Sequence, residues 1–165
     1  MLHITYGSAG TFRVTTEEKR CNTSVASRNI RLLFKFTNDM DKRVVYAYGQ
    51  NQVHNDTIRT YQRYTKVVIN HNATEDVFAG RVNFRPMGYW KYEIYEVSWI
   101  GTVSLSASTA PINETTVLEV DDDNGIVQCL VETGKLYVTE TVGDEQVRYT
   151  TYTETAGTNY IHTEH

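Results

Sequence analysis

The 165-residue chain has little proline, little cysteine and no long apolar run. Pro86 and Pro111 are its only prolines, so it has no Pro-rich linker, and we expect one domain. No segment approaches the about 20 apolar residues that cross a bilayer as a helix. The opening MLHITYGSAG lacks the basic and apolar regions of a secretory signal. We therefore expect a protein that neither spans a membrane nor is exported.

The chain also lacks an excess of positive charge. Twenty acidic residues against sixteen basic ones give a formal net charge of −4. A domain of this charge gains no counterion-release affinity for phosphates, so nucleic acid is not an expected partner.

Cysteine is scarce, and its pairing stays open. Cys21 lies in the polar stretch CNTS, Cys129 lies in the apolar run IVQCLV, and no CxxC or Cys/His pattern surrounds either residue. A folded sandwich could bring the two together, but sequence alone cannot place their Cβ atoms within bonding distance. The missing export signal favours free thiols in a reducing cytoplasm.

Compact catalytic and metal-binding motifs are missing as well. The five histidines have no metal-ligand spacing, and no nucleophile elbow, P-loop or zinc-protease motif occurs. Glu93 and Glu96 lie three apart on a predicted strand, so they face opposite sides and are interpreted as surface charge. The acidic run 121–125 could hold a cation, although a solvated acidic hairpin is favoured over that alternative. We expect no catalytic residues, no metal, no cofactor and no small-molecule ligand.

What the chain does have is a period-2 alternation of apolar residues, which indicates strands. Thr, Tyr and Val are plentiful and fit a pleated surface better than a helix. The segment Thr74–Phe78 is the one modest helical candidate. The predicted strands are 29–39, 43–49, 11–16, 64–70, 80–84, 88–97, 101–106, 125–131, 134–140 and 146–152. This spacing predicts an all-β, single-domain antiparallel β-sandwich, Ig-like or jelly-roll-like, with little helix.

The alternation also predicts the core and the domain limits. One face of 29–39 carries Phe34 and Phe36, and one face of 88–97 carries Trp90, Tyr92 and Ile94, so these five residues are the predicted core. We expect the sandwich to span residues 1–152, and the tail 153–165 to form an arm that reaches a neighbouring subunit.

Two polar stretches interrupt the strand rhythm and are predicted loops. They are residues 50–63 and 106–124. Within the second, Asn124-Gly125 predicts a two-residue hairpin between VLEV (117–120) and IVQCLV.

Aromatic residues exceed what the core can hold. Cross-strand packing, a protein interface and glycan stacking are the three explanations, since Tyr and Trp favour interfaces as well as sheet surfaces. The candidate interface residues are Tyr46, Tyr48, Tyr61, Tyr64, Tyr95 and Trp99, with Tyr89 as a further exposed aromatic.

Four segments in this order resemble a known family. They are LLFKFTNDMD (32–41), QRYTKVVI (62–69), GYWKYEIYE (88–96) and TGKLYV (133–138). The chain resembles small β-sandwich virion proteins of tailed bacteriophages over about residues 11–140. The tail 141–165 and the loop 106–124 fall outside the resemblance.

The resemblance implies a structural, non-enzymatic part of a phage particle, assembled in the bacterial host cytoplasm. It implies an auxiliary or decoration protein on the head, or else a neck or tail component. The implied partners are the major capsid protein or other virion subunits, in a symmetric multi-copy assembly. A carbohydrate-binding β-sandwich module is the alternative, and a hydrolase is a weaker one because no carboxylate pair can be nominated for it.

Overall fold

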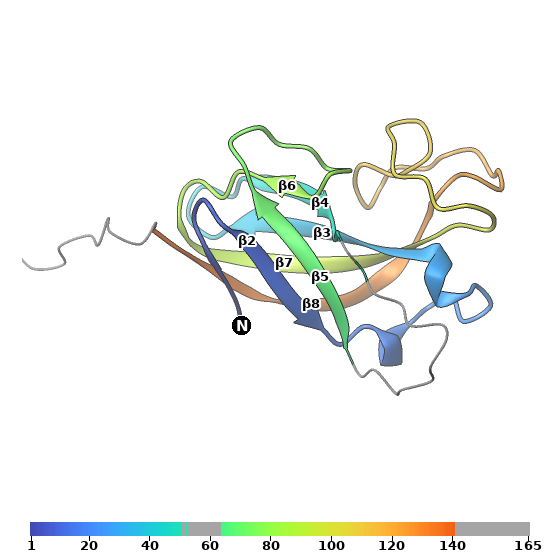
Figure 1. Ribbon diagram of the computed structural model, residues 1–165, viewed down its shortest axis with the longest axis horizontal. Helices are drawn as coiled ribbons and strands as arrows, with labels where there is room; N and C mark the ends of the chain where they lie inside the picture. Colours follow the sequence, from blue (N-terminus) through green and yellow to red (C-terminus); the bar gives the residue numbers. More distant parts are fainter. Residues whose placement is uncertain (51, 53–63, 141–165) are drawn as a thin grey trace, which may run out of the picture.

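Two β-sheets pack face to face in the structure, a computed structural model that describes residues 1–50, 52 and 64–140 (Figure 1). The larger sheet has the strand order β1 (Leu2–Thr5), β8 (Ile126–Thr139), β7 (Gly88–Ser98), β3 (Ile30–Asn38) and β4 (Val44–Tyr48). The smaller sheet has the order β2 (Ala9–Val14), β5 (Thr65–His71) and β6 (Arg81–Val82). Between β2 and β3 lie two 3-10 turns, η1 (Glu17–Lys19) and η2 (Ser27–Asn29). The predicted all-β sandwich with little helix is therefore confirmed.

The strand directions differ from a wholly antiparallel sandwich. β1 pairs in parallel with β8, and β5 pairs in parallel with β6. The pairs β2–β5, β3–β4, β3–β7 and β7–β8 are antiparallel. The first parallel pair joins Leu2 to Leu136, and no local pattern in the chain encodes a contact over that separation. The N-terminal strand itself was not predicted.

Two predicted strands are one continuous strand. The ranges 125–131 and 134–140 merge into β8, because Gly134 stands opposite Tyr92 in the ladder instead of forming a turn. A Cβ atom at position 134 would lie 2.5 Å from the Tyr92 hydroxyl oxygen, so the ring of Tyr92 lies over the glycine. An aromatic ring that covers a glycine in this way stabilises a strand that the glycine would otherwise weaken.

Other expected elements are absent from the described residues. The ranges 101–106 and 117–120 form no strand, so the predicted hairpin at Asn124-Gly125 is wrong. Thr74–Phe78 forms turns rather than a helix. The predicted strand 146–152 and the tail 153–165 lie outside the described residues. Among the residues that are described, no helix is long and apolar enough to cross a membrane.

The turn after β3 forms by the chemistry that its residues predict. The Asn38 side-chain oxygen accepts hydrogen bonds from the backbone N–H groups of Met40 (2.8 Å) and Asp41 (3.2 Å). Asn is favoured at such positions because its short side chain can satisfy the turn backbone. The turn brings β4 alongside β3, with Phe34 opposite Ala47.

The main hydrophobic core lies between the two sheets. All five predicted core residues belong to it, and each is at most 5% exposed. The smaller sheet contributes Phe12, Val14, Val67, Ile69 and Val82. Phe84 packs edge-on against Phe36 and Trp90, with ring centroids 5.1 and 5.6 Å away. This core holds the smaller sheet on the larger one, since each fully buried large apolar side chain contributes about 1.5–3 kcal/mol.

A second hydrophobic cluster lies on the opposite face of the larger sheet. We call this set the outer cluster: Leu33, Tyr48, Val97, Trp99 and Ala110. Residues 99–125, which we call the covering loop, leave the end of β7 and lie over one end of that face (Figure 1). The central strands β3 and β7 are therefore buried on both sides at this end.

Gly125 lets the covering loop close tightly on this cluster. A Cβ atom there would lie 2.5 Å from Trp99 Cζ2 and 3.1 Å from Pro111 Cδ. The Gly125 N–H also donates a 2.8 Å hydrogen bond to the Thr109 carbonyl. The residue that sequence analysis assigned to a hairpin turn is thus needed for close packing against an indole ring.

Replacing a core ring should destabilise the domain far more than an exposed replacement does. We expect Phe36→Ala to lower the free energy of unfolding by about 3–5 kcal/mol, because it leaves a cavity between the sheets. Met40→Ala is the control, since Met40 is 76% exposed, and it should change stability by less than about 0.5 kcal/mol. Urea unfolding measures both. A loss below about 1 kcal/mol for Phe36→Ala would contradict the two-sheet core.

Candidate interaction surface

Two of the six candidate interface aromatics lie inside the domain. Tyr48 and Trp99 are 0% exposed and belong to the outer cluster. The Tyr48 hydroxyl donates a 2.8 Å hydrogen bond to the Pro111 carbonyl, and burial raises the pKa of Tyr48 above its usual range. The prediction that these two residues contact a partner is wrong. Alternation places Tyr48 on the outward face, but the covering loop, which begins with Trp99 and is distant in sequence from Tyr48, packs over that face.

Tyr46 and Tyr95 are half-buried on the same face and lie beside a charged network. The Tyr46 hydroxyl donates a 2.7 Å hydrogen bond to Glu114, which the Lys35 ammonium also contacts. Lys35 lies 3.5 Å from the Glu93 carboxylate. These contacts connect β3, β4 and β7 with Glu114 of the covering loop. The two tyrosines therefore support the loop more than they offer a free surface.

The network shifts the titration of its members. Desolvation alone would raise the pKa of Glu114, but hydrogen bonds from Lys35 and Tyr46 outweigh it, and the pKa lies below its usual value. Burial, together with the hydrogen bond to Glu114, raises the pKa of Tyr46 to about 12. The hydrogen bond to Glu114 raises the pKa of Lys35. At neutral pH the network therefore holds one ammonium, two carboxylates and a neutral phenol.

The remaining aromatics are exposed, at two separate places. Tyr89 is 54% exposed and packs against Tyr137 of β8, with ring centroids 4.8 Å apart. Tyr64 is 47% exposed, and the Arg13 guanidinium carbon lies 5.8 Å from the centre of its ring. The sixth candidate, Tyr61, lies outside the described residues. The structure therefore does not gather the predicted aromatics into one patch.

The outer face of the smaller sheet is basic around Tyr64. Arg13 of β2 and Lys66 of β5 are direct register partners, and both are exposed. Alternation turns them outward, because their neighbours Phe12 and Val67 point into the core. We call Arg13, Tyr64 and Lys66 the basic face.

The covering loop exposes apolar side chains that sequence analysis did not single out. Val117 is 91% exposed and Val120 is 83% exposed, although both were assigned to a strand of the predicted hairpin. We call residues 117–123 the loop tip. Its backbone is held in place: the Gly101 N–H donates to the Asp122 carbonyl (2.8 Å), and the Asn124 side-chain amide donates to the Glu119 carbonyl (2.9 Å).

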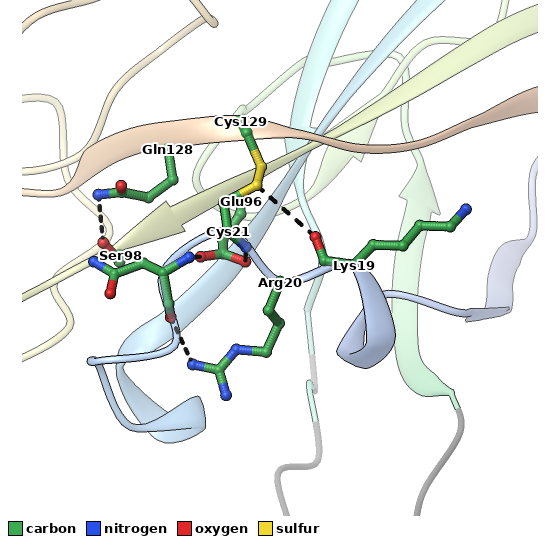
Figure 2. Close-up of a disulfide and its surroundings, with 8 residues drawn as sticks. Lys19, Arg20, Cys21, Glu96, Ser98, Gln128 and Cys129 are labelled. Atoms are coloured by element: carbon green, nitrogen blue, oxygen red, sulfur yellow. Dashed lines mark hydrogen bonds between the residues drawn. A yellow bond between two sulfur atoms is a disulfide. The ribbon is translucent and has the colours of Figure 1, made fainter.

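Cys21 and Cys129 form a disulfide, which corrects the preference for free thiols (Figure 2). Their Cα atoms are 6.3 Å apart, and 108 positions separate them in sequence. The bridge ties the segment that contains η1 and η2 to strand β8. Local spacing carries no signal for a bridge of this length, because only the folded sheets bring the two residues together.

The buried Glu96 carboxylate holds the same segment beside the bridge. Its two oxygens accept hydrogen bonds from the backbone N–H groups of Cys21 (3.1 Å) and Asn22 (3.0 Å) (Figure 2). Glu96 is also the register partner of Cys129, so the disulfide and the carboxylate act at neighbouring positions. The interpretation of Glu96 as surface charge is therefore wrong: it points between the sheets and satisfies loop backbone.

The acidic residues of the loop tip do not form a recognisable metal centre. In the ranges that the structure describes, no group of three or more His, Cys, Asp and Glu side chains is arranged to hold a metal ion. The Asp121 side chain instead accepts a hydrogen bond from the Asp122 N–H (2.6 Å).

Comparison with known proteins identifies no relative of this chain. No family model matches it. The curated proteins and the solved structures likewise contain no match. The surfaces described above and the resemblance of the four sequence segments are the remaining indications of function.

Removing the disulfide should destabilise the domain without unfolding it at room temperature. We expect Cys21→Ser/Cys129→Ser to lower the free energy of unfolding by about 2–5 kcal/mol, because the bridge closes a long loop. Urea unfolding measures the loss, and peptide mapping under non-reducing conditions checks the pairing in the wild type. Wild-type protein treated with a reductant should match the double variant. An unfolding curve that does not respond to reductant would contradict the bridge.

The Glu114 network should make stability depend on pH in a definite direction. Because its pKa in the folded state is lowered, Glu114 contributes fully above its unfolded pKa of about 4.3, and the contribution is lost as pH falls through the folded value. We expect Glu114→Gln to cost about 1 kcal/mol more at pH ~6 than at pH ~3. Unfolding curves at both pH values measure this. Glu75→Gln, at the exposed pair with Arg43, is the control for loss of a surface carboxylate and should cost at most about 1 kcal/mol.

Proposed function

We propose that this chain is a structural component of a tailed-bacteriophage particle, namely an auxiliary or decoration protein bound to the capsid. The alternative within this proposal is that the chain is a structural protein of the neck or tail of the particle. The chain acts by contact with neighbouring subunits rather than by chemical turnover.

The observation that carries the proposal is the position, within the larger sheet, of the two segments that most specifically resemble the phage proteins. FKFTND is the second half of β3 with its turn, and GYWKYEIYE is most of β7. β3 pairs with β7 along the whole length of β3, from Ile30–Ser98 to Asn38–Trp90. They form the centre of the larger sheet and contribute all five predicted core residues. The segments that resemble the phage proteins are thus the ones that build the frame of this domain.

The disulfide supports a role outside the reducing cytoplasm. Disulfides persist in secreted proteins, in the periplasm and on virion and cell surfaces. A phage particle is assembled in the cytoplasm and released by lysis into an oxidising medium, where Cys21 and Cys129 can pair. The bridge then stabilises a particle that must survive outside the cell.

Binding in many copies explains how contacts that are individually weak suffice for such a role. A protein that binds a symmetric lattice in many copies stabilises the assembled state by linkage, even where each contact is weak. The backbone hydrogen bonds that hold the covering loop on the larger sheet reduce the conformational entropy that is lost when each contact forms.

A carbohydrate-binding module is the second candidate, and the observation that favours it is the exposed Tyr89 packed against the half-buried Tyr137. Two aromatic faces side by side on a sheet can stack on a sugar ring. A glycan array tests this alternative: saturable binding that is lost in Tyr89→Ala would favour it over the structural role.

Mass spectrometry of purified phage particles from the source host tests the main proposal. We expect this chain in a fixed, stoichiometric ratio to the major capsid protein, and a cryo-EM map of the same particles should place it at symmetry-related positions. Particles with and without tails separate the head from the neck or tail. Absence of the chain from particles that carry all other structural proteins would refute the proposal.

A further inference from the structure

Little in the described part of the chain covers the two valine side chains of the loop tip. Val117 and Val120 are almost fully exposed, although the backbone around them is held by hydrogen bonds and the loop is anchored on the buried Trp99. Contiguous exposed apolar area with a polar rim marks surfaces that bind another protein. The loop tip is therefore presented in a fixed conformation, as a contact surface requires.

The charge around the loop tip defines the chemistry of its partner. Between Tyr92 and Gly134 the sequence has eight acidic residues and no Lys or Arg. Four of the eight have partners elsewhere in the domain: Glu93, Glu96, Glu114 and Glu132. The other four, Glu119, Asp121, Asp122 and Asp123, are exposed and lie next to the two valines in the sequence. A partner surface must therefore be basic, with apolar area at its centre.

The basic face of this same chain has that chemistry. Arg13 and Lys66 stand directly opposite each other across the β2–β5 pair, and like charges at such positions repel. Within the described residues, no ion pair involves either of them. Tyr64 offers an exposed ring beside Arg13. An acidic partner would remove the repulsion, and the ring and the aliphatic stems could pack on valine side chains.

We propose that the loop tip of one copy docks on the basic face of a second copy. Val117 and Val120 pack on Tyr64 and on the stems of Arg13 and Lys66, while Asp122 and Asp123 pair with the two cationic heads. The two surfaces are different parts of the molecule, so the contact is head to tail and leaves one free surface of each kind per pair of copies. Such a contact propagates into a ring or an open row.

This contact deepens the proposed function, because it supplies the subunit-to-subunit interaction of a multi-copy structural protein. Its test uses the purified chain alone, whereas the particle experiment above tests the function. A chain found in particles that does not self-associate refutes only the contact, and a chain that self-associates but is absent from particles refutes only the function.

Analytical ultracentrifugation of the purified, oxidised chain measures the association. We expect concentration-dependent self-association below about 1 mM, weakened at least about tenfold by high salt, because charge pairs at an exposed interface are screened. Wild-type protein that stays monomeric up to that concentration would overturn the proposal.

Matched variants separate this contact from any other. Val117→Ser/Val120→Ser, Asp122→Asn/Asp123→Asn and Arg13→Gln/Lys66→Gln should each weaken association at least about tenfold. Met40→Ser controls for loss of an exposed apolar side chain, and Glu18→Gln/Asp41→Asn controls for loss of two acidic charges elsewhere. Both controls should associate as the wild type does. Thermal unfolding checks that every variant keeps its fold, which we expect because the replaced side chains are exposed.

A mixing experiment tests the head-to-tail arrangement itself. The variants Val117→Ser/Val120→Ser and Arg13→Gln/Lys66→Gln each keep one intact surface, and the two surfaces are complementary. Their equimolar mixture should therefore form a one-to-one dimer and nothing larger. A mixture that remains monomeric, or an Arg13→Gln/Lys66→Gln variant that still associates as the wild type does, would overturn the proposal.

Discussion

Burial on both faces of β3 and β7 is the constraint on which the rest of the structure depends. Their inward side chains form the core between the sheets, and Leu33 and Val97 on their outward faces need a second cover. The covering loop supplies it with Trp99 and Ala110. An exposed apolar surface of this kind would favour aggregation, so the long connection between β7 and β8 is part of the packed domain.

One covalent link and two sets of polar contacts keep this packed end in one conformation. The disulfide and the Glu96 carboxylate hold the segment between β2 and β3, and the contacts of Glu114 with Lys35 and Tyr46 hold the covering loop. Each is a long-range contact between a loop and the larger sheet. Together they leave the loop backbone little freedom, which is a property that a binding surface on a loop needs if it is to bind without a large ordering cost.

The surface that results differs from a row of exposed aromatics. Most aromatic residues in excess of the core support the covering loop or pack across strands, and the two most exposed large apolar side chains of the described residues are Val117 and Val120 of the loop tip. Negative charge collects around these valines, and positive charge collects on the outer face of the smaller sheet. The domain is therefore polarised in a way that its modest net charge of −4 does not reveal. Such polarity suits ordered assembly more than non-specific association.

Local sequence determined the strands, the turn at Asn38 and the inward faces, because alternation and turn chemistry act over a few residues and β3 and β7 obey both. Only the tertiary structure decided which outward faces stay exposed. Tyr48 and Trp99 are buried because residues more than 60 positions away from Tyr48 fold over it. The Cys21–Cys129 bridge, the parallel β1–β8 pair and the buried Glu96 likewise join segments more than 70 residues apart. Contacts over such separations depend on the whole chain's path, and a single sequence carries no local signal for them.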